Sequence, residues 1–161
     1  HRPAGGAADA LGAVAREVTQ VDFHTGLADK LAYACRLLRK AYRSQARVVV
    51  TGDAAQLARL DQLLWTFDVG EFIPHARLRA GEQPAPRLAP TPLWLAERPG
   101  DVAGCDVLVN LGPAPLADAP LPARTIELVA RTDDEVAAGR QRWRAHLAAG
   151  RTPVNHPQSA A

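Results

Sequence analysis

The 161-residue sequence predicts a single α/β domain with a mostly parallel sheet flanked by helices. Residues 46–53 (ARVVVTGD) form a β-branched run, which is typical of a strand buried on both faces of a parallel sheet. Helical patterns precede and follow this run, so strands and helices alternate. The composition, with 47% hydrophobic and 22% charged residues, fits one globular domain with a sizeable core.

The first half of the chain predicts two strand–helix units. Residues 19–25 (TQVDFHT) alternate apolar and polar side chains and predict a strand. Apolar residues then recur at helical spacing over 27–42. After the strand at 46–53, Asp53 and Gln56 form a capping-box-like start to a second helix. This order favours a right-handed crossover onto a parallel sheet.

The second half predicts a loop, three strands and a final helix. Residues 76–91 are rich in Pro, Gly and Arg and predict an exposed loop. The predicted strands cover 92–96, 105–110 and 124–130. Thr132 and Glu135 have the spacing of a capping box, so we expect a last helix that runs to Gly150.

The ends of the chain predict less order. Residues 1–18 are weakly helical in pattern, and we expect a flexible N-terminal extension there. The folded domain is expected to span 19–150, and residues 151–161 (RTPVNHPQSAA) are expected to form a flexible tail.

Charge, cysteines and hydropathy exclude several classes of protein. The net charge of +2 is small and the basic residues are scattered, so direct DNA binding has no support. Cys35 and Cys105 stand singly, without the spacing of a zinc site or a disulfide framework. No apolar run approaches the ~20 residues of a membrane span. We therefore expect a cytoplasmic protein without a metal and without a membrane contact.

The strand-to-helix turns lack the motifs that bind nucleotides. The turn 51–56 (TGDAAQ) has one glycine and no GK[ST], and the turn 24–29 (HTGLAD) has no G-x-G-x-x-G. His24, His75 and His146 have no sequence-adjacent nucleophile or paired carboxylate. The sequence predicts a Rossmann-like fold with no nucleotide site, no cofactor and no catalytic residue.

Two other classes stay open at this point. One is a small Rossmann-like enzyme, dependent on a nucleotide or S-adenosylmethionine, that uses the turns at 24–26 and 51–53. The other is a domain that binds RNA or DNA on its own. A thermal shift with nucleotides would favour the first, and affinity for an oligonucleotide would favour the second.

Aromatic residues gather at the end of the second predicted helix, in residues 60–75 (LDQLLWTFDVGEFIPH). Trp65 lies roughly 130° from the centre of this helix's apolar stripe, and Phe72 and Pro74 follow a few residues later. The stripe itself comprises Leu57, Leu60, Leu64 and Phe67. Large aromatic side chains outside a core stripe are typical anchors of protein interfaces, so we expect a docking surface here.

The last predicted helix carries a second candidate surface. One stripe comprises Val136, Arg140, Trp143 and Leu147, and a smooth separate face comprises Ala138, Ala145 and Ala149. If the alanines face the core, then Arg140, Trp143 and Arg144 point outward, and an arginine beside an indole can bind a carboxylate. The alternative is that Trp143 is buried and Arg140 reaches past it to solvent.

These segments together carry a family resemblance. Residues 60–75, with RVVVTGD before them and RQRWRAHLAAG (140–150) at the far end, resemble the chi subunit of bacterial DNA polymerase III holoenzyme. The resemblance covers about Thr19 to Gly150 and implies a non-enzymatic adaptor. Its implied partners are the psi subunit of the clamp loader and the acidic C-terminal tail of single-stranded-DNA-binding protein, with DNA contacted only indirectly.

The resemblance also assigns residues to each partner. Trp65 and Phe72, with Pro74 beside them, match the psi-facing surface, which a helicase partner also uses in some relatives. Arg140, Trp143 and Arg144 match the positions that bind the tail. This sequence departs from the family pattern at Val136 and Leu147, where basic residues are expected.

Overall fold

The computed structural model describes residues 19–116 and 120–159. Its seven strands form one sheet in the order β3-β4-β2-β5-β6-β1-β7, and every neighbouring pair is parallel. The strands are β1 (Gln20–Leu27), β2 (Val48–Thr51), β3 (His75–Leu78), β4 (Leu93–Ala96), β5 (Val107–Asn110), β6 (Arg124–Ala130) and β7 (Val154–Pro157). The expected α/β class is confirmed.

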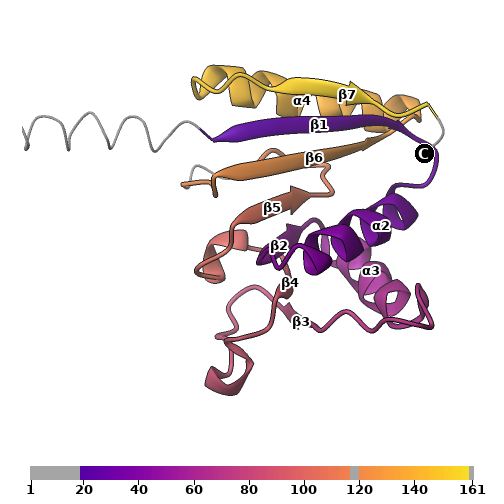
Figure 1. Ribbon diagram of the computed structural model, residues 1–161. Helices are drawn as coiled ribbons and strands as arrows, with labels where there is room; N and C mark the ends of the chain where they lie inside the picture. The colour runs from indigo at the N-terminus through magenta and orange to yellow at the C-terminus, as the bar shows by residue number, and fades with distance from the viewer. Residues whose placement is uncertain (1–18, 117–119, 160–161) are drawn as a thin grey trace, which may run out of the picture.

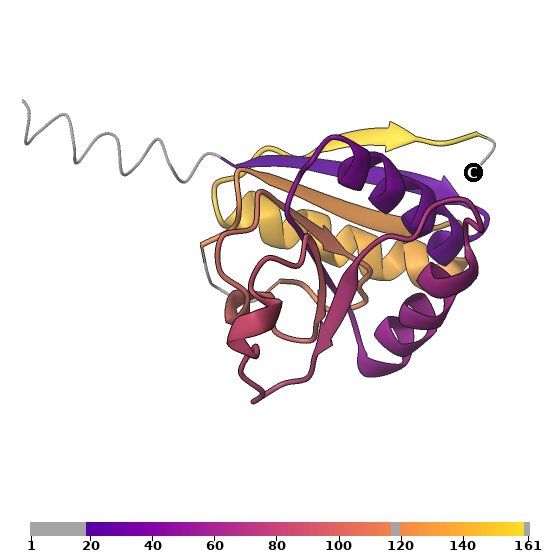
Figure 2. The ribbon, with the colours of Figure 1, turned by 60° about the horizontal axis from the view of Figure 1, so that its bottom comes forward.

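Within the described residues, three α-helices cover the sheet, α2 (Lys30–Arg43) and α3 (Ala54–Thr66) on one face and α4 (Asp133–Ala148) on the other. Figure 1 shows α4 running alongside β1 and β7, while α2 and α3 lie together. In the turned view of Figure 2, the sheet lies between α4 and the layer formed by α2 and α3. Short 3₁₀ helices, η1 (Pro86–Leu88) and η2 (Pro99–Asp101), interrupt the loops on either side of β4.

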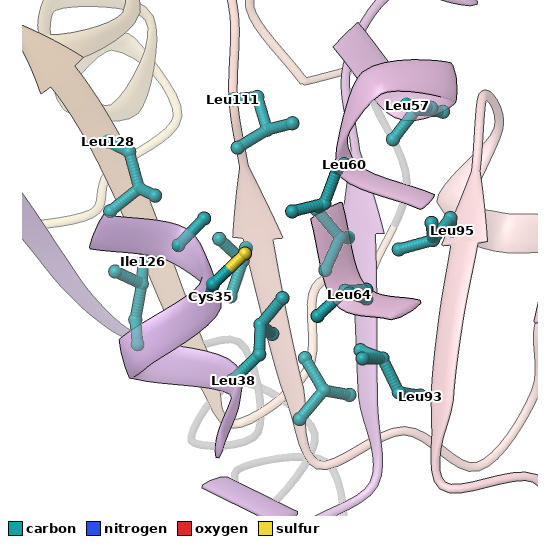
Figure 3. Close-up of a cluster of buried hydrophobic side chains, with 14 of the residues drawn as sticks. Cys35, Leu38, Leu57, Leu60, Leu64, Leu93, Leu95, Leu111, Ile126 and Leu128 are labelled. Carbon is teal, nitrogen blue, oxygen red and sulfur yellow. The ribbon is translucent and has the colours of Figure 1, made fainter. Parts of the chain in front are cut away.

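The main core lies between the sheet and the layer of α2 and α3, as Figure 3 shows. The predicted helical stripes supply it: Cys35 and Leu38 from α2 and Leu57, Leu60 and Leu64 from α3 belong to the same buried cluster. The capping box of Asp53 and Gln56 at the start of α3 is confirmed. The backbone amide of Gln56 donates to Asp53 Oδ1 at 2.8 Å. Such a cap contributes about 1 kcal/mol to the helix.

The start of α4 is as expected, but its cap is different. Thr132 is the N-cap residue, yet its side chain makes no capping hydrogen bond, so the predicted capping box is wrong. The Glu135 carboxylate instead accepts hydrogen bonds from the Ala130 amide at 3.0 Å and from Lys30 Nζ at 2.8 Å. The Lys30 ammonium draws Glu135 away from the cap, and their ion pair joins the starts of α2 and α4.

Two expectations about irregular segments are wrong. Part of the predicted loop at 76–91 is β3, which pairs with β4 and closes one edge of the sheet. The predicted flexible tail contains β7, which pairs with β1 and closes the other edge. Both are four-residue edge strands without a repeating apolar pattern. Their extended conformation depends on pairing with the neighbouring strand, which their own sequences do not indicate.

Candidate binding surfaces

The first candidate surface lies where α3 leads into β3, and we call it the aromatic cluster: Trp65, Phe72 and His75. The Trp65 and Phe72 side chains are 62% and 52% exposed. Their rings are stacked, with centroids 5.1 Å apart and planes 28° apart, and His75 meets Trp65 edge-on at 5.1 Å. Trp65 is exposed because the preceding Leu64 belongs to the buried stripe. The prediction that Trp65 lies off the core is confirmed.

The aromatic cluster rests on a fixed support. His75 is held at both ring nitrogens, by the Ile73 carbonyl oxygen at 2.7 Å and by Asp61 Oδ1 at 3.0 Å. Ile73 is buried, and it stands in sequence between two members of the predicted surface, the exposed Phe72 and the half-buried Pro74. This arrangement positions the rings before any ligand arrives.

Basic residues of α2 hold the turn that precedes Phe72. Arg39 lies 3.1 Å from Asp68 and Arg43 lies 2.7 Å from Glu71. The hydrogen bond from the Gly70 amide and the one from Arg39 keep the pKa of Asp68 below its usual range. Between these anchors Val69 is fully exposed. Sequence patterning missed Val69; its signal was an apolar residue in a turn, between Asp68 and Gly70, where no core position exists.

The second candidate surface is a groove of about 520 Å³, which we call the α4 groove. It is built from β1, β6, β7 and α4 at the opposite edge of the sheet. Its lining residues are Phe23, Thr25, Gly26, Val129, Arg131, Val136, Gly139, Arg140, Trp143 and Asn155. The structure therefore brings the predicted pair Arg140 and Trp143 together in one concave site.

Aromatic side chains form the floor of the α4 groove. Phe23 is buried and Trp143 is half-buried, with ring centroids 5.0 Å apart and planes 58° apart. Gly139 lets α4 approach the sheet this closely, because a Cβ there would lie 2.9 Å from Val129 Cγ1. The structure combines features of both sequence-based alternatives, the outward-pointing Trp143 and the buried Trp143. Trp143 is packed on one side and accessible on another, and Arg140 is exposed.

The face of α4 that packs on the sheet is polar, which corrects the expectation that its alanines face the core. The buried residues of α4 are Gly139, Arg142 and His146. The alanines lie beside this stripe: Ala138 and Ala145 are half-buried and Ala149 is exposed.

The reason is the carboxylate of Glu127, which lies fully buried on β6 beneath the helix. Arg142 Nε is 2.7 Å from one of its oxygens and His146 Nε2 is 2.8 Å from the other. A buried carboxylate requires such partners.

A chain of hydrogen bonds extends this buried contact to the C-terminal segment. Arg151 Nε donates to His146 Nδ1 at 2.8 Å, and Arg142 Nη2 donates to the Leu128 carbonyl oxygen at 2.9 Å. Because Arg151 donates to Nδ1, that nitrogen is the acceptor, and His146 Nε2 carries the proton that it donates to Glu127. The network fixes the rotation of α4 and thereby the direction in which Arg140 points.

The third predicted member of the tail site, Arg144, is exposed on α4 but does not line the groove. Two residues that the sequence did not indicate do line it: Arg131, next to the N-cap of α4, and Asn155 on β7. Thr25 Oγ1 donates to Asn155 Oδ1 at 2.7 Å, which joins β1 to β7 along this wall. Asn155 was missed because β7 was expected to be a flexible tail.

A clasp on the opposite side of β7 holds this wall in place. His156 Nε2 lies 2.7 Å from Asp22 Oδ1, and the Asp22 side chain is only 4% exposed. The neighbouring His24 contacts the Tyr33 hydroxyl at 2.5 Å, and burial together with the charge of His156 lowers the pKa of His24. His24, His75 and His146 all make contacts that organise the fold.

A cavity of about 900 Å³ lies where several strands end, including β2 and β5. Two of its polar lining side chains bond within the chain: Thr51 donates to the Glu97 carbonyl oxygen, and Asn110 accepts from the Gly112 amide at 2.9 Å. Asp53 at its rim caps α3. Over residues 19–116 and 120–159, no group of three or more His, Cys, Asp or Glu residues could hold a metal ion. No helix in those ranges is long and apolar enough to span a membrane.

Comparisons with known proteins agree on one family. Residues 18–153 match the family model of the DNA polymerase III chi subunit, HolC. The chain is 35% identical over 144 residues to the DNA polymerase III subunit chi of Pseudomonas aeruginosa, covering 86% of this chain and 96% of that protein. It is 30% identical over 96 residues to the probable DNA polymerase III subunit chi of Rickettsia prowazekii, covering 59% of this chain and 55% of that protein.

Solved structures resemble the chain in fold. The C-terminal domain of the DEAD-box protein Dbp5 matches with a TM-score of 0.55 at 11% identity, covering 88% of this chain and 92% of the domain. The same domain of the Saccharomyces cerevisiae protein, a variant bound to Gle1, matches with a TM-score of 0.52 at 11% identity, covering 86% of this chain and 90% of that one.

Proposed function

Because the chain belongs to the DNA polymerase III chi subunit family, a family of non-catalytic accessory subunits, we propose that it links the clamp loader to coated single-stranded DNA. In this proposal the aromatic cluster binds the psi subunit, and the α4 groove binds the acidic C-terminal tail of single-stranded-DNA-binding protein. The observation that carries the proposal is that two accessible aromatic surfaces lie at opposite edges of one sheet.

The aromatic cluster has the chemistry of an interface hot spot. Trp65 and Phe72 offer a rigid, stacked apolar surface, and Val69 extends it. Aromatic anchors of this kind commonly contribute 2 kcal/mol or more each when a partner covers them. Pro74 continues the same segment beside the buried Ile73. The surface suits an apolar face of a partner polypeptide, and a helicase that uses it would compete with psi.

The α4 groove has the chemistry of a site for a carboxylate next to an aromatic side chain. Its floor of Phe23 and Trp143 is apolar, and Arg140 stands at its rim. Burying one phenylalanine ring contributes about 2–3 kcal/mol, and each hydrogen bond from a guanidinium to a carboxylate adds about 1.5–3 kcal/mol. Ordering a flexible tail costs several kcal/mol in return. A dissociation constant near micromolar, about −8 kcal/mol, is the expected range.

The experiment that tests this function reconstitutes the bridge. Purified chain, psi and single-stranded-DNA-binding protein on an oligonucleotide are sedimented together. We expect psi to sediment with the protein-coated DNA only when this chain is present. The chain alone should not sediment with bare DNA. Binding of the chain to bare DNA with no partner, or a dose-dependent thermal shift with nucleotides, would contradict the adaptor function.

A further inference from the structure

The rim of the α4 groove carries a second cation, Arg131, in addition to Arg140. Its side chain is exposed and lines the same concave site as Arg140. Among the ten residues that line the groove, these two arginines are the charged ones, and no carboxylate is present. The groove therefore presents two positive charges above an aromatic floor.

The contacts of Arg131 leave its guanidinium available. The Arg131 backbone amide donates to the Leu27 carbonyl oxygen at 3.0 Å, which fixes the residue at the end of β6. Among the residues that the structure describes, no carboxylate lies within 4.0 Å of the guanidinium of Arg131 or of Arg140.

Asp133 and Asp134 follow Arg131 in sequence, and the carboxylate of Asp134 takes hydrogen bonds from Thr132 and from the Glu135 amide. The exposed guanidinium of Arg131 therefore has no carboxylate partner among the described residues and is available to a ligand.

The spacing of the two arginines indicates what each would contact. Arg140 precedes Trp143 by three residues, so the two lie on neighbouring turns of α4. A ligand side chain that covers the indole therefore places its own terminal carboxylate next to Arg140. Arg131 lies beyond the N-terminus of α4, and the helix rises about 10 Å between Asp133 and Arg140. An extended peptide covers that length in about three residues.

We propose that Arg131 binds an acidic side chain about three residues before the C-terminal residue of the tail, while Arg140 binds the terminal carboxylate. This assignment rests on the proposed tail-binding function of the α4 groove. It makes the groove selective for peptides that carry two negative charges at this separation and an aromatic side chain at the end. The free amide group of Asn155, whose Oδ1 is already held by Thr25, supplies a neutral donor on the opposite wall.

The experiment compares three synthetic octapeptides by calorimetric titration. The first has acidic residues, a C-terminal phenylalanine and a free carboxylate, the second is its C-terminal amide, and the third has Asn in place of the acidic residue three positions before the end. The chain is tested unmodified and as R131Q, R140Q and the control R59Q. Arg59 is exposed on α3, on the other face of the sheet, so its change removes the same charge from a distant site.

We expect R131Q to bind the first peptide about tenfold more weakly, the cost of one exposed charge-assisted hydrogen bond. R131Q should keep the preference for the free carboxylate over the amide and lose the sensitivity to Asn. R140Q should show the reverse, and R59Q should bind as the unmodified chain does.

Equal binding by R131Q and the unmodified chain, or an undiminished effect of Asn in R131Q, would overturn the assignment of Arg131 while leaving tail binding in place. Failure of the unmodified chain to bind the first peptide would overturn the proposed tail-binding function, and the assignment with it.

Discussion

At the scale of single residues, neighbouring positions on one helix have opposite roles. Leu64 is 3% exposed and belongs to the core, whereas Trp65 is 62% exposed and stacks on Phe72. A helix turns about 100° per residue, so the stripe that buries Leu64 necessarily turns Trp65 outward. Sequence patterning predicts this division because the stripe is apolar and regular.

The first prediction concerns this pair. Trp65→Ala or Phe72→Ala should weaken psi binding by about 2–4 kcal/mol, because each removes an anchor of the interface. The urea midpoint of unfolding should stay nearly unchanged, since both side chains are largely exposed. Leu64→Ala is the matched control, because it should lower the free energy of unfolding by about 2–5 kcal/mol. Psi affinity unchanged in a folded Trp65→Ala chain would refute the role of the aromatic cluster.

The second prediction concerns a residue that the sequence did not single out. Glu127→Ala leaves the guanidinium of Arg142 buried without its counter-charge. Removing one partner of a buried pair costs about 3–5 kcal/mol, so we expect a loss of that size in urea unfolding at neutral pH. A loss below about 1 kcal/mol, within the range of exposed pairs, would show that the network does not hold α4 on the sheet.

Residue patterns alone could not have predicted this network. The sequence of α4 offers a regular set of alanines, and small apolar residues usually face a core. Glu127, however, comes from a strand whose side chains alternate between the two faces of the sheet, and nothing local shows that its face lies under α4. Only the pairing of β6 with α4 makes Arg142 and His146 the buried residues.

At the scale of elements, the long regular segments were predictable and the short edge strands were not. The helices and the buried strands follow apolar periodicity because their faces are filled by a common core. All four residues of β7 are exposed, so no such signal exists. What holds β7 is its ladder with β1 and the contact between His156 and Asp22. The sequence therefore predicts the helix that forms one side of the α4 groove, but it does not predict the wall formed by β7.

The third prediction follows from that wall. A chain that ends at Thr152 keeps the hydrogen bond from Arg151 to His146 but lacks β7, Asn155 and the clasp, so it should bind the acidic tail peptide at least about tenfold more weakly, while psi binding is kept. His156→Ala alone should cause a smaller loss in the same direction, because the ladder with β1 remains. Titration of both chains with peptide and with psi is the measurement. Full tail affinity in the shortened chain would exclude β7 from the site.

At the scale of the whole molecule, the sheet keeps the two surfaces apart. Five strand spacings separate β3 from β1, which is about 24 Å at the usual distance between strands. The Debye length at physiological ionic strength is about 8 Å, so exposed charges at one edge are largely screened from the other. We therefore expect the two proposed partners to bind the chain independently.

The fourth prediction is a difference in salt dependence. Binding of the tail peptide to the α4 groove should weaken steadily as NaCl is raised from 0.05 to about 0.5 M, because exposed arginines contribute the attraction. Psi binding at the aromatic cluster should change little over the same range, because apolar burial is not screened. Calorimetric titrations in a salt series distinguish the two. Parallel salt dependence for both partners would contradict the chemistry assigned to the surfaces.

A reciprocal titration of Trp65→Ala and Arg140→Ala, each with psi and with the tail peptide, tests whether two separate surfaces of this chain bind two different polypeptides. We predict that Trp65→Ala loses psi affinity and keeps peptide affinity, and that Arg140→Ala keeps psi affinity and loses peptide affinity. Loss of both affinities in either folded variant would show that the two partners do not bind separate surfaces.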